Sequence, residues 1–238
     1  QEFCDKFIED VEGELYKELE QSSFKIKRGD NIAIAVGSRG VANIDKIVKT
    51  TVKYIKHLGG NPFVIPAMGS HGGATPVGQR EILEEYGVTE KYINAPIKSS
   101  MEVVELPNDT LKNRVFMDKY AFESDGVIVI NRVKAHTDFH GDIESGLMKI
   151  CVIGLGKHRQ ALEIHKYGVN GLKNLIVPTA RKVLDTGKVV LGIGLVENSY
   201  DKTAIVKAIM PENIESSEKE LLKISKKMMP SLPIKNID

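Results

Sequence analysis

The segment DGVIVINRV (125–133) constrains the fold of this chain more than any other stretch. Its apolar residues follow one another without the alternation of apolar and polar side chains that marks a strand with one solvent-facing side. Strands covered on both faces belong mostly to parallel sheets, whose crossover connections pack helices on each side. The segment therefore predicts a central strand of a parallel sheet.

The rest of the chain alternates between short β-branched runs and segments with helical periodicity. This β-α-β-α order predicts a single α/β domain over residues 1–238, with a mostly parallel sheet, helices on both faces and a Rossmann-like layered architecture. Further strands are expected at 31–37, 61–68, 102–106, 114–122, 188–200 and 202–210, and helices at 43–60, 75–87, 144–156, 174–188 and 216–230.

Several residues mark where these helices begin or break. Asn43 is the expected N-cap of the first, and Thr75 caps the second with Pro76 in its first turn. Ser216 or Ser217 is expected to cap the last helix, and the segment 174–188 is expected to break near Pro178.

Composition argues against several classes of protein. The formal net charge is +1, so no global field attracts nucleic acid or an anionic membrane. No apolar run reaches the ~18–20 residues that span a bilayer, and the acidic, amphipathic N-terminal stretch does not resemble a signal peptide. The two cysteines lie far apart in sequence, which is not the pattern of a disulfide framework. We expect a cytoplasmic protein.

Two loops at predicted strand ends contain candidate functional residues. Residues 36–43 combine glycines with Ser38 and Arg39 ahead of a helix, a combination that suits a phosphate or carboxylate, although a tight turn with a surface arginine is equally compatible. His71 lies among small residues at 67–75, as a functional group or as an exposed loop histidine. Neither loop is a Walker or GxGxxG motif.

The loop after the third strand contains more candidate functional residues than the other two. The segment KAHTDFHGDIESGLMK (134–149) follows the buried strand and contains His136, His140 and Lys149. His158 and His165 come next, seven residues apart, so one helical face could carry both. The chain contains no HExxH, CxxC or GxSxG, so neither a closed zinc site nor an α/β-hydrolase serine is supported.

These segments together resemble the N-terminal domain of the nickel-dependent lactate racemase family, which also contains racemases and epimerases of other 2-hydroxy acids. The matching stretches are GSRGVANIDKIV, AMGSHGGATPVGQREIL, DGVIVINRVKAHTDF, IESGLMK and EIHKYG, and they span most of residues 30–200 in a consistent order. The resemblance implies a nickel-pincer nucleotide as cofactor, a small 2-hydroxy acid as substrate, and a second, C-terminal domain that this chain does not include.

The resemblance also implies roles for individual residues. Lys149, at the end of SGLMK, would hold the cofactor covalently, and His165, sixteen residues later, would complete the nickel coordination. His71 and His136 would act as acid/base groups on the two sides of the substrate during transient hydride transfer. Arg39, Ser38 and Ser145 are expected to bind the cofactor, and the nearby His140, Asp138, Asp142 and Glu144 are expected to orient these groups.

Departures from the family pattern leave alternatives open. Val36 and Gly37 stand where the family usually has an acid before the arginine, and the segment between His136 and Lys149 is longer, so His140 could replace His136. A hydrolase or lyase could instead use a simple divalent metal held by His71, His136 and His140. The chain could also be a non-catalytic module that binds a phosphate or nucleotide. An isolated domain is expected to be inactive without its covering domain.

Overall fold

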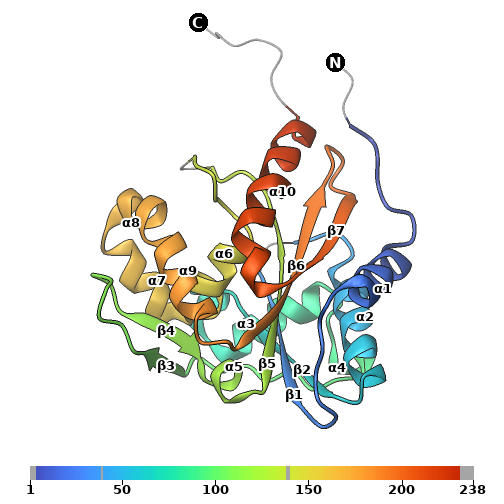
Figure 1. The fold of residues 1–238 in the computed structure, drawn as a ribbon, viewed down its shortest axis with the longest axis horizontal. Helices are drawn as coiled ribbons and strands as arrows, with labels where there is room; N and C mark the ends of the chain where they lie inside the picture. The colour runs from blue at the N-terminus through green and yellow to red at the C-terminus, as the bar shows by residue number, and fades with distance from the viewer. Residues whose placement is uncertain (1–3, 39, 138–139, 231–238) are drawn as a thin grey trace, which may run out of the picture.

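A five-stranded sheet forms the centre of the molecule, in the order β2-β1-β5-β6-β7 (Figure 1). The computed structural model describes residues 4–38, 40–137 and 140–230. Strands β2, β1, β5 and β6 run parallel, and β7 pairs antiparallel with β6 at one edge. The strands are β1 (Asn31–Val36), β2 (Asn61–Pro66), β5 (Gly126–Arg132), β6 (Val189–Glu197) and β7 (Thr203–Ile209), with a separate antiparallel pair of β3 (Val103–Leu106) and β4 (Val115–Asp118).

The apolar side chains of β5 pack into two hydrophobic cores, one on each face of the sheet. Val127 and Val129 pack into the core on one face of the sheet, whereas Ile128 and Ile130 pack into the core on the other. All four side chains are completely buried. The sequence of β5 lacks polar alternation because both faces of the strand are covered, as predicted. The mostly parallel α/β sheet is confirmed.

Helices cover both faces of the sheet (Figure 1). The face of Ile128 packs against α1 (Val11–Gln21), α2 (Ile44–His57), α3 (Pro76–Glu85) and α4 (Glu90–Ile93). The face of Val127 packs against the β3–β4 pair, α5 (Lys119–Glu123), α6 (Leu147–Lys149), the π-helical turn η2 (Ile150–Gly154), α7 (Lys157–His165), α8 (Gly168–Asn174), α9 (Ile176–Leu184) and α10 (Ile214–Met228). Short 3₁₀ turns lie at η1 (Gly72–Ala74) and η3 (Pro211–Asn213).

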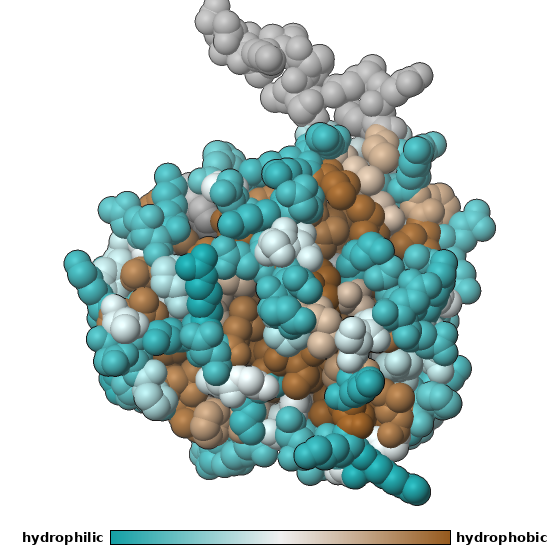
Figure 2. All heavy atoms as spheres, viewed as in Figure 1, coloured by the Kyte–Doolittle hydropathy of each residue, from teal (hydrophilic) through white to brown (hydrophobic). Residues whose placement is uncertain are grey.

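The surface in front of these elements is mainly polar. Figure 2 shows hydrophilic side chains over most of this face, with hydrophobic ones exposed in its middle and beside α10. Among the described helices, none has both the length and the apolar character needed to cross a bilayer.

Two predicted side-chain N-caps are not formed, although α2 does begin directly after Asn43, as predicted. Asn43 adopts a left-handed conformation with φ 59°, and its amide donates to Thr203 Oγ1 (3.1 Å) rather than capping α2. The last helix, α10, begins at Ile214, so Ser216 and Ser217 lie inside it. Thr75 does cap α3, accepting a hydrogen bond from the N–H of Gly78 (3.1 Å).

Two element boundaries also differ from the prediction. The expected strand at 114–122 ends at Asp118, whose carboxylate accepts the N–H of Ala121 (2.9 Å) and starts α5. The helical segment 174–188 breaks at Leu175, and Pro178 lies in the first turn of α9, where its missing N–H removes no helical hydrogen bond.

Candidate active site at the ends of three parallel strands

The candidate site lies where the strand order reverses. Strand β1 lies between β2 and β5, so the chain leaves β1 toward one side and returns on the other. The loops after adjacent strands diverge at such a point and open a crevice beyond their carboxyl ends. One cleft at this position is lined by residues from all three predicted loops and from α7: Ser38, His71, His136, Ser145, Lys149 and His165.

His71 lies in a loop with a defined structure. Gly69 and Gly72 have φ near +60°, and a Cβ on Gly72 would approach the backbone of Gly78 within 2.5 Å. The buried Gln79 amide donates to the carbonyl oxygens of Gly69 (3.0 Å) and His71 (3.2 Å). A hydrogen bond also joins His71 Nδ1 to Ser38 Oγ, which ties the loops after β1 and β2 together. His71 is solvent-accessible, but its loop is held at the cleft.

His136 is the buried histidine at the end of β5. Its backbone N–H donates to Glu144 Oε2 (2.6 Å), and its side chain is almost fully inaccessible to solvent. Lys134 and Ser145 pair through two backbone hydrogen bonds (2.8 and 3.2 Å), which close the base of the loop between them. The loop is therefore tied at its base and from within, and it presents His136 to the cleft.

Glu144, buried beneath this loop, is ionised. Burial alone would raise the pKa of this carboxyl, but hydrogen bonds from Lys226 (2.6 Å) and from the N–H groups of His136 and Gly141 (3.0 Å) together hold it below its usual value. The expectation that Glu144 orients neighbouring groups thus has a geometric basis.

Lys149 ends α6, just before the π-helical turn η2. The start of α6 is held from two sides: Asn131 Nδ2 donates to the carbonyl oxygen of Gly146 (2.8 Å), and Glu218 of α10 accepts the N–H of Met148 (2.7 Å). Position 146 requires glycine, because a Cβ there would overlap the Glu218 carboxylate. The glycine of the Ser-Gly pair in the sequence is therefore explained by the close approach of Glu218 to the helix that carries Lys149.

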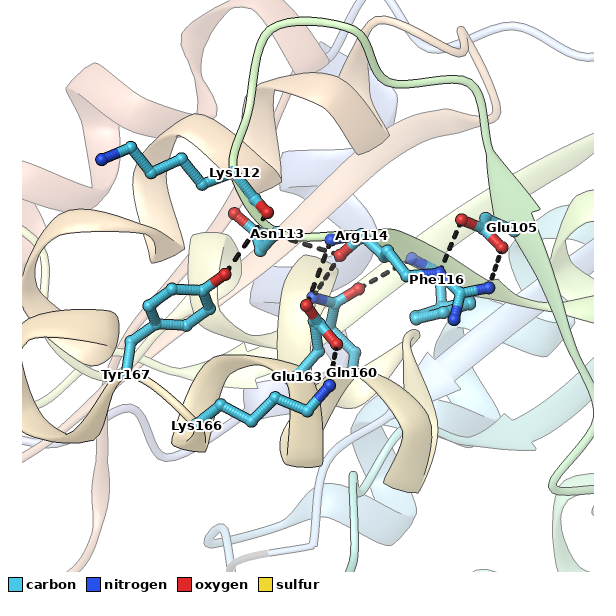
Figure 3. Close-up of polar contacts among 9 residues, drawn as sticks. All are labelled: Glu105, Lys112, Asn113, Arg114, Phe116, Gln160, Glu163, Lys166 and Tyr167. Carbon is cyan, nitrogen blue, oxygen red and sulfur yellow. Dashed lines mark hydrogen bonds and ion pairs between the residues drawn. The ribbon is translucent and has the colours of Figure 1, made fainter.

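His165 reaches the cleft from α7, whose opposite side is fastened to β4 (Figure 3). The buried Gln160 accepts the N–H of Phe116 (2.7 Å) and donates to the carbonyl oxygen of Arg114 (3.0 Å), as a neighbouring strand would. Glu163 accepts a weaker hydrogen bond from the N–H of Arg114 (3.4 Å). These contacts fix the rotation of α7 and hence the direction of His165.

Two other candidate histidines do not line this cleft. His140 is 76% exposed at the side chain and does not line this cleft, so His136 is the histidine that the structure brings to it. His158 is on α7 but is not among the cleft residues. Arg39 and Asp138 lie outside the residues that the structure describes. Across the described residues no group of three His, Cys, Asp or Glu side chains is arranged to hold a metal ion, so the simple divalent-metal site of His71, His136 and His140 is not supported.

The structure adds Arg132 to the cleft, which the sequence analysis did not single out. Its guanidinium pairs with Glu197 Oε2 at the end of β6, and the other oxygen of Glu197 accepts the N–H of Ala42 (2.7 Å). Arg132 thus connects β5 to the loop after β1. The sequence signal was present, since Arg132 and Glu197 are charged residues that end two apolar strands.

The fold was compared with those of known proteins. It superposes on the lactate racemase apoprotein from Thermoanaerobacterium thermosaccharolyticum with a TM-score of 0.68 over 92% of this chain. The chain folds like a lactate racemase. The sequence identity to that racemase is 16%, so the likeness is one of fold, and the chain spans 58% of the racemase's length. No protein-family model and no curated protein matches the sequence.

The likeness to a lactate racemase confirms the fold that the motifs of the sequence suggested. Because only 16% of the aligned residues are identical, this agreement in fold does not come from close sequence similarity.

Proposed function

We propose that this chain is the cofactor-binding domain of a 2-hydroxy acid racemase or epimerase that uses a nickel-pincer nucleotide. One observation carries the proposal: His71, His136, Lys149 and His165, each implied by the racemase resemblance, line a single cleft although the sequence separates them by up to 94 positions. The cleft lies at the point of strand reversal where α/β folds bind ligands.

The side chains around the cleft are compatible with such a cofactor. Lys149 provides an amine for covalent attachment, and the imidazole of His165 is a suitable ligand for nickel. Arg132 and Lys134 add positive charge at the end of β5, which favours a phosphate group. Ser38, after β1, and Ser145, before α6, contribute hydroxyl groups to the lining of the cleft.

When bound, the nickel-pincer nucleotide supplies a reversible hydride acceptor. The chain itself supplies proton transfer: His71 follows β2 and His136 follows β5, so the two imidazoles approach the cleft from either side of β1. In this proposal one imidazole accepts the hydroxyl proton of one enantiomer, and the other returns a proton to the opposite enantiomer. Imidazole suits both directions because its usual pKa is close to neutral pH.

The test is the chemistry of Lys149. Protein matured in the presence of the nickel-pincer nucleotide should gain mass on Lys149 and contain nickel. Lys149→Ala should lose the added mass and the nickel, whereas the exposed Lys223→Ala on α10 should retain both. Unmodified Lys149 in nickel-free protein after maturation would exclude this function.

A second candidate is a phosphate- or nucleotide-binding module without catalysis, favoured by the cationic side chains of Arg132 and Lys134 at the cleft. Such a module would bind a nucleotide without modification of Lys149 and without turnover of any 2-hydroxy acid.

The racemase proposal also includes a covering C-terminal domain and a cytoplasmic location, both implied by the sequence.

A further inference from the structure

Helix α10 lies beside the segment that carries His136 and Lys149, although it is distant in sequence (Figure 1). It packs against both α6 and β6. Two of its charged side chains contact residues 134–149, and both contacts involve a buried carboxylate. Lys226 pairs with Glu144 and also donates to the carbonyl oxygen of Gly141 (3.4 Å), whereas Glu218 accepts the N–H of Met148.

The first contact acts on the His136 loop. Lys226 of α10 lies 2.6 Å from Glu144 Oε1, and the same oxygen accepts the N–H of Gly141 (3.0 Å). The other oxygen of Glu144 accepts the N–H of His136 (2.6 Å). Glu144 is completely buried, so its backbone contacts are not in competition with water.

The second contact acts on the helix that carries Lys149. Glu218 of α10 is also completely buried, and its carboxylate accepts the N–H of Met148 (2.7 Å) at the first turn of α6. Gly146 lies directly against Glu218, which leaves no space for any other side chain at that position.

The two contacts have different targets and are separated along α10. Lys226 and Glu218 lie about 12 Å apart along the helix axis, at ~1.5 Å per residue. One rigid helix thus holds the loop that bears His136 and the start of the helix that bears Lys149. The Lys226–Glu144 ion pair contributes little net stability, because the desolvation of Glu144 offsets the attraction between the two charges. Their contribution is better sought in the geometry that they impose.

We propose that α10 is the positioning element of the cleft, with Lys226 acting on His136 through Glu144 and with Glu218 fixing the start of the Lys149 helix. Neither α10 residue lines the cleft. The effect of α10 on catalysis rests on the proposed racemase function, but the claim that α10 positions these two segments does not.

The test compares Lys226→Met with Lys223→Met in the full chain. Lys223 pairs with Glu220 on the exposed side of the same helix (2.8 Å) and provides the matched control. Amide hydrogen exchange at His136 and Gly141 should accelerate at least tenfold in Lys226→Met. Exchange at Phe116, whose N–H is held by Gln160 away from the cleft residues, should stay as in the unchanged protein. Lys223→Met should alter none of these amides, and Lys226→Arg should restore protection.

A second variant covers the case in which Lys226→Met does not fold. Glu144→Gln keeps an oxygen for the His136 N–H but loses the ion pair with Lys226, and it should give the same local pattern of exchange. Unchanged protection of His136 in a folded variant, or an equal increase at Phe116, would overturn the positioning role. The second pattern would mean that the loss is global rather than local.

Turnover separates this proposal from the racemase proposal. In the loaded enzyme, Lys226→Met should lower kcat several-fold and leave KM near that of the parent, because binding groups remain in place. Accelerated exchange at His136 in a protein that never acquires the Lys149 adduct would support the positioning role while refuting the racemase function. An active enzyme in which Lys226→Met leaves the exchange of the His136 amide unchanged would support the racemase function and refute the positioning role.

Discussion

Lys157 Nζ lies 2.9 Å from Asp118 Oδ2, and neither side chain reaches solvent. The same amine donates to the carbonyl oxygen of Pro66 at the end of β2, just before the His71 loop. Burial lowers the pKa of Lys157, and the adjacent Asp118 opposes that effect. One buried amine therefore joins β2, β4 and the start of α7.

Replacing this amine should destabilise the whole fold. Lys157→Met would leave the Asp118 carboxylate buried without its cation, and such losses typically cost about 3–5 kcal/mol. Urea denaturation followed by circular dichroism gives the change in the free energy of unfolding. Lys119→Met, which removes an exposed pair with Glu102, serves as the control and should leave the denaturation midpoint unchanged. Similar midpoints for the two variants would show that the buried pair does not matter.

Glu218 should make the stability of the protein depend on pH. Burial raises the pKa of this carboxyl from its ordinary 4.5 to about 7 in the folded state. Because the folded state holds the proton more tightly, the stability contributed by Glu218 is fully present below the unfolded pKa and is lost as pH rises through 7. The change is on the order of 3 kcal/mol at ~1.4 kcal/mol per pKa unit.

Glu218→Gln should remove that slope, so the variant should lose less stability than the parent between pH 4.5 and pH 7. Thermal denaturation at several pH values measures the difference. Glu220→Gln, on the exposed side of the same helix, should keep the slope of the parent. A parent protein whose stability does not fall over this range would contradict the assigned ionisation.

The two neighbouring histidines after β5 should differ sharply in their effect on catalysis. In the loaded enzyme, His136→Gln should reduce kcat/KM by about 10²–10⁴, the usual contribution of a positioned acid or base. For racemisation the reduction is equal in both directions, since the equilibrium constant is set by the substrate. His140→Gln should retain activity because His140 faces solvent. Chiral chromatography of the product mixture measures both, and the opposite ranking would assign the role to His140.

Gln160 should be needed to hold α7. Gln160→Leu would leave the buried N–H of Phe116 without its partner, which costs about 1–3 kcal/mol, whereas the carbonyl oxygen of Arg114 would keep its hydrogen bond from Asn113 Nδ2 (3.0 Å). Nickel content after maturation should fall with stability, because His165 lies on the same helix. Tyr167→Phe removes an exposed hydrogen bond to Lys112 (3.3 Å) near the same junction and should change stability by less than ~0.5 kcal/mol. Equal melting temperatures for the two variants would contradict this.

The parts of the structure that the sequence predicted are those with local causes. The buried run at Val127–Ile130 revealed a parallel strand because each of its side chains must be covered. Thr75 and Pro76 predicted a helix start because cap and first turn lie within one short stretch. Asn43 marks the start of α2 as predicted, but its side chain binds Thr203, far along the chain, instead of capping the helix. Ser216 is not a cap because α10 already begins at Ile214.

The cleft was predictable in its residues but not in its supports. Loops after parallel strands meet at one edge of a sheet, so His71 and His136 could be brought together from the strand pattern alone. The supports come from long-range pairs: Lys226 with Glu144, Glu218 with Met148, and Gln160 with Phe116. No spacing rule connects residues that are separated by 44 to 82 positions.

The π-helical turn after Lys149 has a consequence for residue counting. Leu155 donates its backbone N–H to the carbonyl oxygen of Ile150 (2.8 Å), so this turn accommodates one residue more than an α-helical turn would. Deleting one residue between 150 and 154 would remove the extra residue of this turn and bring every residue of α7 one position closer to Lys149 along the chain. The interval between Lys149 and His165 therefore depends on the wide turn as well as on the two helices that flank it.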